Sequence, residues 1–122
     1  MMRSFVLPAL VLLGLATAAQ AQDAAAGEKV FLQCKACHQV GPTAKNAVGP
    51  VLNGLFGRKA GSVEGYSYSN ANKDSGITWT EEAFTTYIKA PREVIKGTKM
   101  IYAGLKDEQK IKDLIAYLKT FQ

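Results

Sequence analysis

Apolar residues recur at helical spacing near both ends of the chain. One stripe at i, i+3, i+4 and i+7 predicts a helix over about 107–120: Ile111, Leu114, Ile115 and Leu118. Near the other end, Asp23 is a suitable N-cap for an Ala-rich helix that we expect to run to Cys34. Gly27 and Phe31 share one face of this helix, and the small residue leaves room for another helix. We therefore expect the terminal helices to pack against each other.

A further helix is expected over Glu81–Lys89. Thr80 is its N-cap, and Trp79 can pack on Phe84 as a hydrophobic staple. The residue before a proline disfavours helix, so the helix ends before Pro91, which can itself open a short helical turn. No segment is typical of a strand. The pattern predicts an all-α fold.

The middle of the chain, residues 39–79, shows little periodicity beyond short turns. It holds seven of the ten glycines that follow residue 21. A loop region of that length is uncommon in a compact domain. An exception is a chain wrapped around a large apolar group, so we expect a bound cofactor at the centre of the core.

The first 21 residues are typical of a cleaved signal peptide. Arg3 supplies the positive start, residues 5–15 are almost wholly apolar, and Ala19-Gln20-Ala21 offers a cleavage site. The apolar run is short for a membrane span, so we expect no stable membrane insertion. Residues 22–122 then form a single domain, exported to the periplasm.

The charge of the chain is positive and unevenly distributed. Without the leader, 14 basic residues stand against 10 acidic ones, and the excess lies within 89–106. There, five basic residues accompany only Glu93: Lys89, Arg92, Lys96, Lys99 and Lys106. We interpret this run as a docking patch for an acidic partner, the alternative being a solvated helix face. Nucleic acid is not expected as a partner, because no aromatic residues alternate with the basic ones.

The most specific signal is Cys34-Lys35-Ala36-Cys37-His38, which holds both cysteines and the one histidine. A redox dithiol is typical of a motif surrounded by strands, which are not predicted here. A structural zinc site needs four protein ligands, and the chain has no further cysteine or histidine to complete them. The third interpretation is covalent haem, with Cys34 and Cys37 bonded to the two vinyl groups and His38 bound to the iron. The loop-rich middle and the leader favour this one.

A second axial ligand cannot be histidine, because the chain has only one. Met1 and Met2 belong to the leader, which leaves Met100 in a loop after a helix end. Met100 is thus the expected sixth ligand, unless the iron is open or a weaker ligand such as lysine binds.

The chain resembles class I cytochrome c, of the small bacterial kind close to the mitochondrial protein. The resemblance covers nearly all of residues 22–122, through "CKACH", "GPVLNGLFGRKAG", "YSYSNANKDSGITW", "GTKMIYAGLK" and "DLIAYLK", in the family's order. It implies the cytochrome c fold, with loops and short helices around one covalent haem c.

The resemblance also implies roles for residues beyond the haem motif. Pro50 would accept a hydrogen bond from the ligand histidine. Arg58, Tyr68 and Trp79 would hold the haem propionates. A polar network beside the methionine sulfur would consist of Asn72, Tyr87 and Thr98.

Three departures from the family pattern concern the surface. The stretch "FLQC" before the haem motif is one residue short and lacks a lysine usual there. Tyr102 stands in place of a phenylalanine near the exposed haem edge, and Lys96 in place of a proline. They bear on the partner surface and leave the expected fold and ligation unchanged.

The expected function is one-electron transport through a His/Met-ligated haem, not enzymatic catalysis. Methionine ligation and burial both favour ferrous iron and a high potential. The partners would be acidic sites on a quinol–cytochrome c oxidoreductase, a terminal oxidase or a photosynthetic reaction centre, and we expect a monomer. The alternative is a haem enzyme or gas-binding protein with a displaceable Met100.

Overall fold

The computed structural model describes residues 2, 4–11 and 22–122. The expected cleavage site at Ala19-Gln20-Ala21 lies outside the described residues, so it stays a prediction. Residues 4–11 form no helix, and apolar side chains among them, such as Phe5, are exposed. No helix in these ranges is long and apolar enough to cross a membrane.

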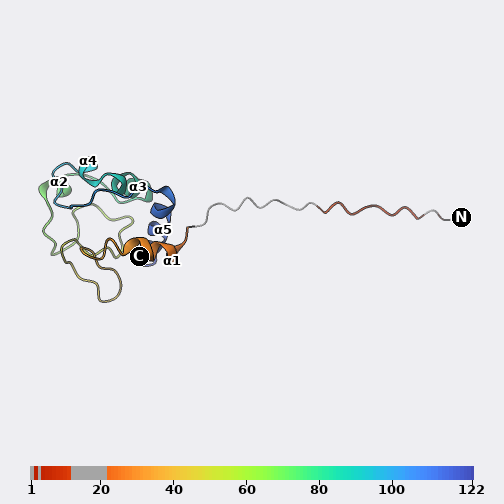
Figure 1. The fold of residues 1–122 in the computed structure, drawn as a ribbon, viewed down its shortest axis with the longest axis horizontal. Helices are drawn as coiled ribbons and strands as arrows, with labels where there is room; N and C mark the ends of the chain where they lie inside the picture. Colours follow the sequence, from red (N-terminus) through yellow and green to blue (C-terminus); the bar gives the residue numbers. More distant parts are fainter. Residues whose placement is uncertain (1, 3, 12–21) are drawn as a thin grey trace.

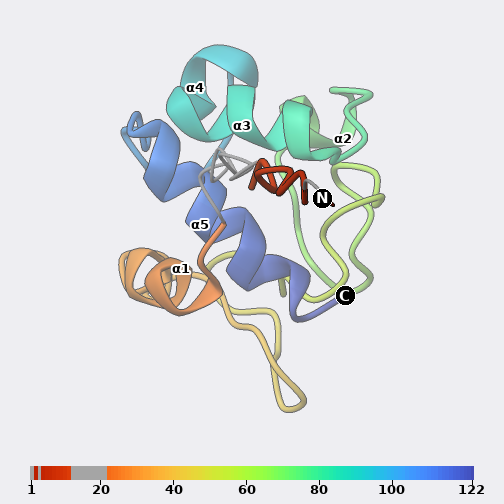
Figure 2. The same ribbon diagram turned by 90° about the vertical axis from the view of Figure 1, so that its right-hand side faces the viewer.

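Residues 22–122 form helices joined by long loops (Figure 1). The helices are α1 (Ala24–Phe31), α2 (Asn70–Lys73), α3 (Glu81–Lys89), α4 (Pro91–Val94) and α5 (Glu108–Lys119). The described residues contain no strand, only an isolated antiparallel bridge between Lys59 and Thr78. The all-α prediction is therefore confirmed. In Figure 2, α3 and α4 lie along one side of the domain, α1 lies on the other, and α5 runs between them.

The terminal helices pack against each other, as the sequence predicts. They approach so closely at Gly27 that a β-carbon there would lie 1.9 Å from the carbonyl oxygen of Asp113. Phe31, one turn further on, is buried with Ile111 and Leu114 of α5. The small residue thus lets the two backbones meet, and the apolar stripe fills the space beside them.

A buried carboxylate also links the start of α1 to α5. Asp113 is 7% exposed, and its Oδ1 accepts hydrogen bonds from the backbone N–H of Asp23 at 3.1 Å and from Nε2 of Gln109 at 2.9 Å. Asp23 in turn caps α1, because its carboxylate accepts from the N–H of Ala26. The start of α1 is therefore held by α5, 90 residues away in sequence.

The central helices follow their capping signals. α3 spans the predicted Glu81–Lys89, and the Thr80 side chain accepts a hydrogen bond from the N–H of Ala83 at 3.0 Å. The two staple residues, Trp79 and Phe84, are both buried in the core. α4 begins at Pro91, which has no N–H to leave unpaired in the first turn.

Two local predictions need correction. The first helix ends at Phe31, not at Cys34, and tight turns follow: the N–H of Cys34 donates to the Phe31 carbonyl at 2.8 Å, and that of His38 to the Cys34 carbonyl at 2.9 Å. These turns place Cys34 and His38 on the wall of the same cavity.

α2 is a single helical turn that the sequence did not predict, because four residues are too few to show periodicity. The side chain of Ser69 caps it.

The glycine-rich middle is held by bonds to distant backbone. The side chain of Asn53 both accepts from and donates to the backbone of Gly41, at 2.9 and 2.8 Å. The side-chain amide of Gln122 pairs in the same two-bond manner with the backbone of Phe56. The loops are thereby fixed at several points without a sheet.

We expect Gly27→Ala to lower the free energy of unfolding by about 1–3 kcal/mol, because the new methyl group would push α1 away from α5. The better helix propensity of alanine offsets at most about 1 kcal/mol of this. Urea unfolding of the haem-loaded protein, followed by circular dichroism, measures the change. Ala25→Val enlarges an exposed position of the same helix and serves as the control. An unchanged stability for Gly27→Ala would contradict the close approach.

Candidate functional site

A cavity of about 320 Å³ lies between the loops and the helices. This volume is within the range of small-molecule and cofactor sites. The eleven residues expected to bind the haem or its iron, or to support the ligands, all line it: Cys34, Cys37, His38, Pro50, Arg58, Tyr68, Asn72, Trp79, Tyr87, Thr98 and Met100. Core residues such as Phe84 and Leu114 supply apolar wall. Residues spread over 67 positions of sequence thus meet in one cavity.

The two cysteines form no disulfide with each other and are each partly buried, in the turns that follow α1. Burial, and next the neighbouring Cys37, raise the pKa of the Cys34 thiol to about 11. Cys34 is therefore a neutral thiol at neutral pH in the folded chain. Two thiols on the cavity wall, separated by two residues, suit covalent attachment of a group inside the cavity.

His38 is oriented by the backbone of the following loop. Its Nδ1 lies 2.8 Å from the carbonyl oxygen of Pro50, and since a carbonyl only accepts, Nδ1 carries the proton. The Nε2 lone pair is then free to bind a metal. Gly49 makes this arrangement possible, because a β-carbon there would lie 2.3 Å from Cε1 of the imidazole.

The imidazole of His38 is held in its neutral form. Burial lowers its pKa, the hydrogen bond to Pro50 opposes that shift, and the positive charge of Arg58 adds to it. Neutral imidazole is the form that binds metals.

Met100 is partly buried against the core, and its sulfur has a defined polar partner. The hydroxyl of Tyr87 donates to Sδ of Met100 at 3.0 Å. Burial raises the pKa of Tyr87 to about 12, against the smaller opposing effect of a hydrogen bond with Thr98, so the hydroxyl keeps its proton. Thr98 Oγ1 also accepts from the N–H of Met100 at 3.2 Å. Tyr87 thus bonds to the thioether of Met100 and Thr98 bonds to its backbone, and their role at a haem stays a prediction.

Arg58 is a half-buried cation that no carboxylate pairs within the described residues. Its Nη1 donates to the carbonyl oxygens of Val51 at 3.0 Å and Asn53 at 3.2 Å, and burial lowers its pKa. A cation in such a place is stabilised by an anionic group in the cavity. The carboxylates of a haem are suitable partners.

Asn72 carries the one buried side-chain acceptor without a hydrogen-bond partner in the described ranges, its Oδ1. Such an atom costs free energy unless a donor reaches it. Because Asn72 lines the cavity, the missing donor belongs to the contents of the cavity, a cofactor group or a water held with it. Arg58 thus fits a large, partly anionic cofactor, and Asn72 Oδ1 fits a donor such as a water held beside it.

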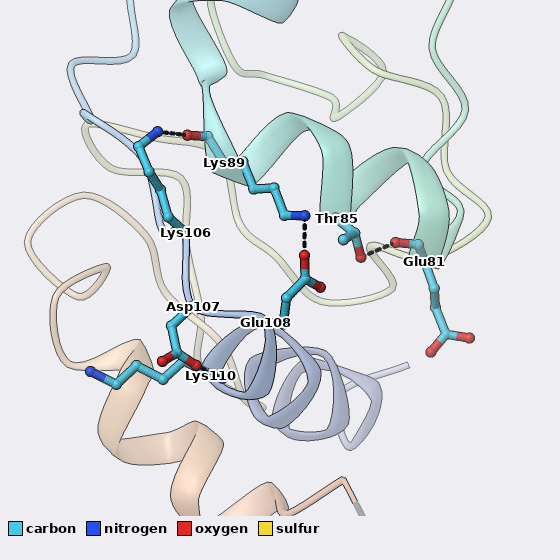
Figure 3. Close-up of polar contacts among 7 residues, drawn as sticks. All are labelled: Glu81, Thr85, Lys89, Lys106, Asp107, Glu108 and Lys110. Carbon is cyan, nitrogen blue, oxygen red and sulfur yellow. Dashed lines mark hydrogen bonds and ion pairs between the residues drawn. The ribbon is translucent and has the colours of Figure 1, made fainter. Parts of the chain in front are cut away.

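The basic run is less uniform than its sequence suggests. Lys89 forms an ion pair with Glu108 of α5, and Nζ of Lys106 donates to the Lys89 carbonyl at 2.8 Å (Figure 3). Lys99 donates to the carbonyl of Ser67 and lies 4.4 Å from the ring centroid of Tyr66. Arg92 and Lys96 are exposed. The sequence placed only Glu93 among these cations, and the fold adds Glu108.

Several cavity residues had no expected role. Gly49 packs on the His38 ring, the hydroxyl of Tyr66 donates to the Val48 carbonyl at 2.6 Å, and Gln33 and Tyr102 lie at the cavity as well. Gly49 carried a signal because it directly precedes Pro50, and Tyr102 and the stretch with Gln33 had been noted only as departures from the family pattern. The others depend on contacts between distant loops.

The fold and the cavity are those expected of an electron-transfer protein built around haem. Comparison with known proteins identifies the family. The family model described as cytochrome c matches residues 24–122. The chain is 62% identical over 120 residues to a cytochrome c2 of Blastochloris viridis, covering 98% of this chain and 94% of that protein. It is 54% identical to a cytochrome c-550 of Nitrobacter winogradskyi, with 81% and 91% coverage. The structure of cytochrome cH from Methylobacterium extorquens is 48% identical with a TM-score of 0.75, covering 80% and 98%.

The chain therefore belongs to the cytochrome c family, and it is a class I cytochrome c close to the bacterial cytochromes c2. It is an electron carrier, not an enzyme. Its cofactor is one covalent haem c, with which the pair Cys34 and Cys37 is consistent.

We expect the stability of the folded chain to fall as pH drops below about 6.5. His38 is neutral in the folded state with a lowered pKa, so only the unfolded chain takes up its proton there. Its contribution is complete above pH 6.5 and lost as pH approaches the lower folded pKa, at up to about 1.4 kcal/mol per pH unit. Urea unfolding at pH 7 and pH 5.5 tests this. Equal stabilities at the two values would contradict a neutral His38.

Proposed function

We propose that the protein is a periplasmic one-electron carrier whose haem iron is bound by His38 and Met100. The observation that carries this proposal is that the chain's one histidine and Met100 line the same cavity as both cysteines. The leader expected in residues 1–21 supports export, and the family match beginning at residue 24 agrees with it.

The protein residues prepare the haem for electron exchange and exclude other chemistry. When bound, the haem supplies an iron that changes between two oxidation states by one electron. His38, held by Pro50, presents Nε2 to the iron. Met100 offers a soft neutral sulfur, which favours the ferrous state and leaves no position for substrate. The Tyr87 hydroxyl withdraws electron density from that sulfur and acts in the same direction.

The wall of the cavity strengthens this preference. Apolar side chains such as Leu55, Phe84 and Leu118 keep water from the ring, so the extra positive charge of ferric iron is poorly solvated. Arg58 stabilises the negative carboxylates of the haem without a compensating acid nearby. Little has to move when an electron is transferred, which keeps the exchange fast.

The basic patch, defined as Lys89, Arg92, Lys96, Lys99 and Lys106, is the proposed docking surface for acidic sites on a quinol-oxidising complex, a terminal oxidase or a photosynthetic reaction centre. Arg92 and Lys96 are exposed and carry the proposal best. The charge of Lys89 is partly offset by the ion pair with Glu108. Lys99 and Lys106 donate to backbone carbonyls, which carry no opposite charge. Long-range attraction depends on the net charge of this region, so these local bonds leave the electrostatic attraction of an acidic partner in place.

Ligation is tested with carbon monoxide, which binds ferrous haem iron at an open position. We expect the wild-type protein to bind it slowly and Met100→Ala to bind it at least about tenfold faster, because the substitution removes a ligand worth more than 1.4 kcal/mol at the iron. Stopped-flow absorbance measures both rates. Leu105→Ala, a truncation in the same loop away from the cavity lining, is the control. Rapid stoichiometric binding to the wild-type protein would favour a gas-binding or enzymatic role instead.

Docking is tested by charge reversal on the patch. We expect Arg92→Glu with Lys96→Glu to lower the second-order rate of electron transfer to an acidic membrane complex by roughly tenfold or more at low salt, with the difference shrinking as salt rises. Lys110→Glu with Lys112→Glu makes the same change of net charge on exposed positions of α5 and should act much less. Equal effects of the two pairs would show that only total charge matters.

A further inference from the structure

Two departures from the family pattern meet in the folded chain. The hydroxyl of Tyr102 donates a hydrogen bond to Oε1 of Gln33 at 3.0 Å, across 69 positions of sequence. Gln33 belongs to the shortened stretch before the haem motif, and Tyr102 replaces the usual phenylalanine. Both side chains line the cavity, so the bond crosses its edge. The added hydroxyl of Tyr102 thus bonds to the last residue of the shortened stretch before Cys34.

The loop that carries Met100 has little support from its own backbone. Within the described part of the chain, residues 99–104 form no backbone–backbone hydrogen bond. The last such bond before them joins the N–H of Thr98 to the Ile95 carbonyl, and the next joins the N–H of Leu105 to the Ile88 carbonyl. The position of this segment therefore depends on side chains.

Those side chains hold the segment from two sides. Lys99 reaches the carbonyl of Ser67 on one flank, and Tyr102 reaches Gln33 on the other. Ile101 is 90% exposed, whereas Met100 and Tyr102 on either side of it pack partly buried against the core. Met100 and Tyr102 thus face the same side, so holding the ring of Tyr102 also constrains Met100 two residues away.

Gln33 is a firm point of attachment. It directly precedes Cys34, whose N–H donates to the Phe31 carbonyl at the end of α1 at 2.8 Å. α1 in turn packs on α5, and Cys34 itself is bonded to the haem in the working protein. A loop bonded to the exposed side chain of Gln33 is thereby linked to the segment that carries Cys34.

We propose that Tyr102 is a positioning residue, whose hydrogen bond to Gln33 fastens the Met100 loop to the Cys34 segment and holds the thioether on the iron. This inference rests on the ligation proposed above. The bond spans the cavity edge, so its loss lets the loop open more often while the covalent attachment and His38 stay in place. Tyr102 and Gln33 thereby set how readily Met100 leaves the iron.

The test compares Tyr102→Phe with the wild-type haem protein. We expect amide hydrogen exchange in residues 99–104 and the rate of imidazole binding to the ferric protein to rise roughly two- to tenfold, the range that corresponds to one net hydrogen bond. Imidazole needs Met100 to leave, so its binding rate reports opening at the iron. Exchange reports opening of the loop whether or not Met100 is a ligand. Unchanged values of both would overturn the proposal.

Substitutions at the acceptor sharpen the comparison. Gln33→Glu keeps an oxygen for the Tyr102 hydroxyl and should keep both rates near wild type, whereas Gln33→Leu should raise them as Tyr102→Phe does. The double variant Tyr102→Phe with Gln33→Leu should match either single variant, because all three lack the same bond. Fully additive effects, or a Gln33→Glu protein that behaves like Gln33→Leu, would overturn the bridge.

Tyr66→Phe is the matched control. It removes a tyrosine hydroxyl from the same cavity, one that donates to the Val48 carbonyl and not to Gln33. Both rates should stay near wild type, and a rise equal to that of Tyr102→Phe would make the effect unspecific and overturn the proposal.

The sulfur-to-iron absorption band of the ferric wild-type protein separates the two proposals. Its absence would overturn ligation by Met100 and with it the positioning role, even if exchange showed the bond to Gln33. Its presence, together with unchanged rates in Tyr102→Phe, would leave ligation standing and overturn the bridge alone.

Discussion

The fold depends on filling one apolar cavity with a group that the chain does not encode. Phe84, Leu114 and Leu118 belong both to the core and to the cavity wall, so the core is incomplete until the haem occupies it. Asn72 and Arg58 have polar or charged atoms that find no partner of the required kind among the described side chains. Haem binding and folding therefore draw on the same free energy, as in other proteins whose cofactor completes the core.

The cavity is also divided by chemical character, and this division suits a carrier. Neutral groups, His38 and the Met100 thioether with its Tyr87 donor, are those that we propose to meet the iron. The cation Arg58 is the proposed partner of the haem carboxylates. With both of the proposed ligands on the iron, electron exchange would be the remaining reaction, which agrees with a family of electron carriers.

The helix ends were predicted from local signals, such as caps, prolines and apolar spacing. Where such signals are absent, the predictions were wrong or missing. The Thr80 cap and Pro91 marked both ends of α3 correctly, and the apolar stripe marked α5 to within a residue at each end. The end of α1 was placed three residues late, because no glycine or proline marks it. The single-turn α2 was too short to recognise.

The site shows the same contrast. Spacing indicated Cys34, Cys37 and His38, counting indicated Met100, and the other predicted site residues came only from family resemblance. Contacts between distant surface side chains, such as Glu108 with Lys89 or Gln33 with Tyr102, carry no periodic signal in the sequence. They became visible only once the loops were placed.

The close approach of Gly27 to Asp113 sets an order of events as the chain is made. Cys34 and Cys37 are synthesised long before α5, and α1 has no partner helix until α5 is complete. The first helix to be synthesised therefore gains its buried face only when the last one arrives, so removal of α5 would leave α1 without its packing partner.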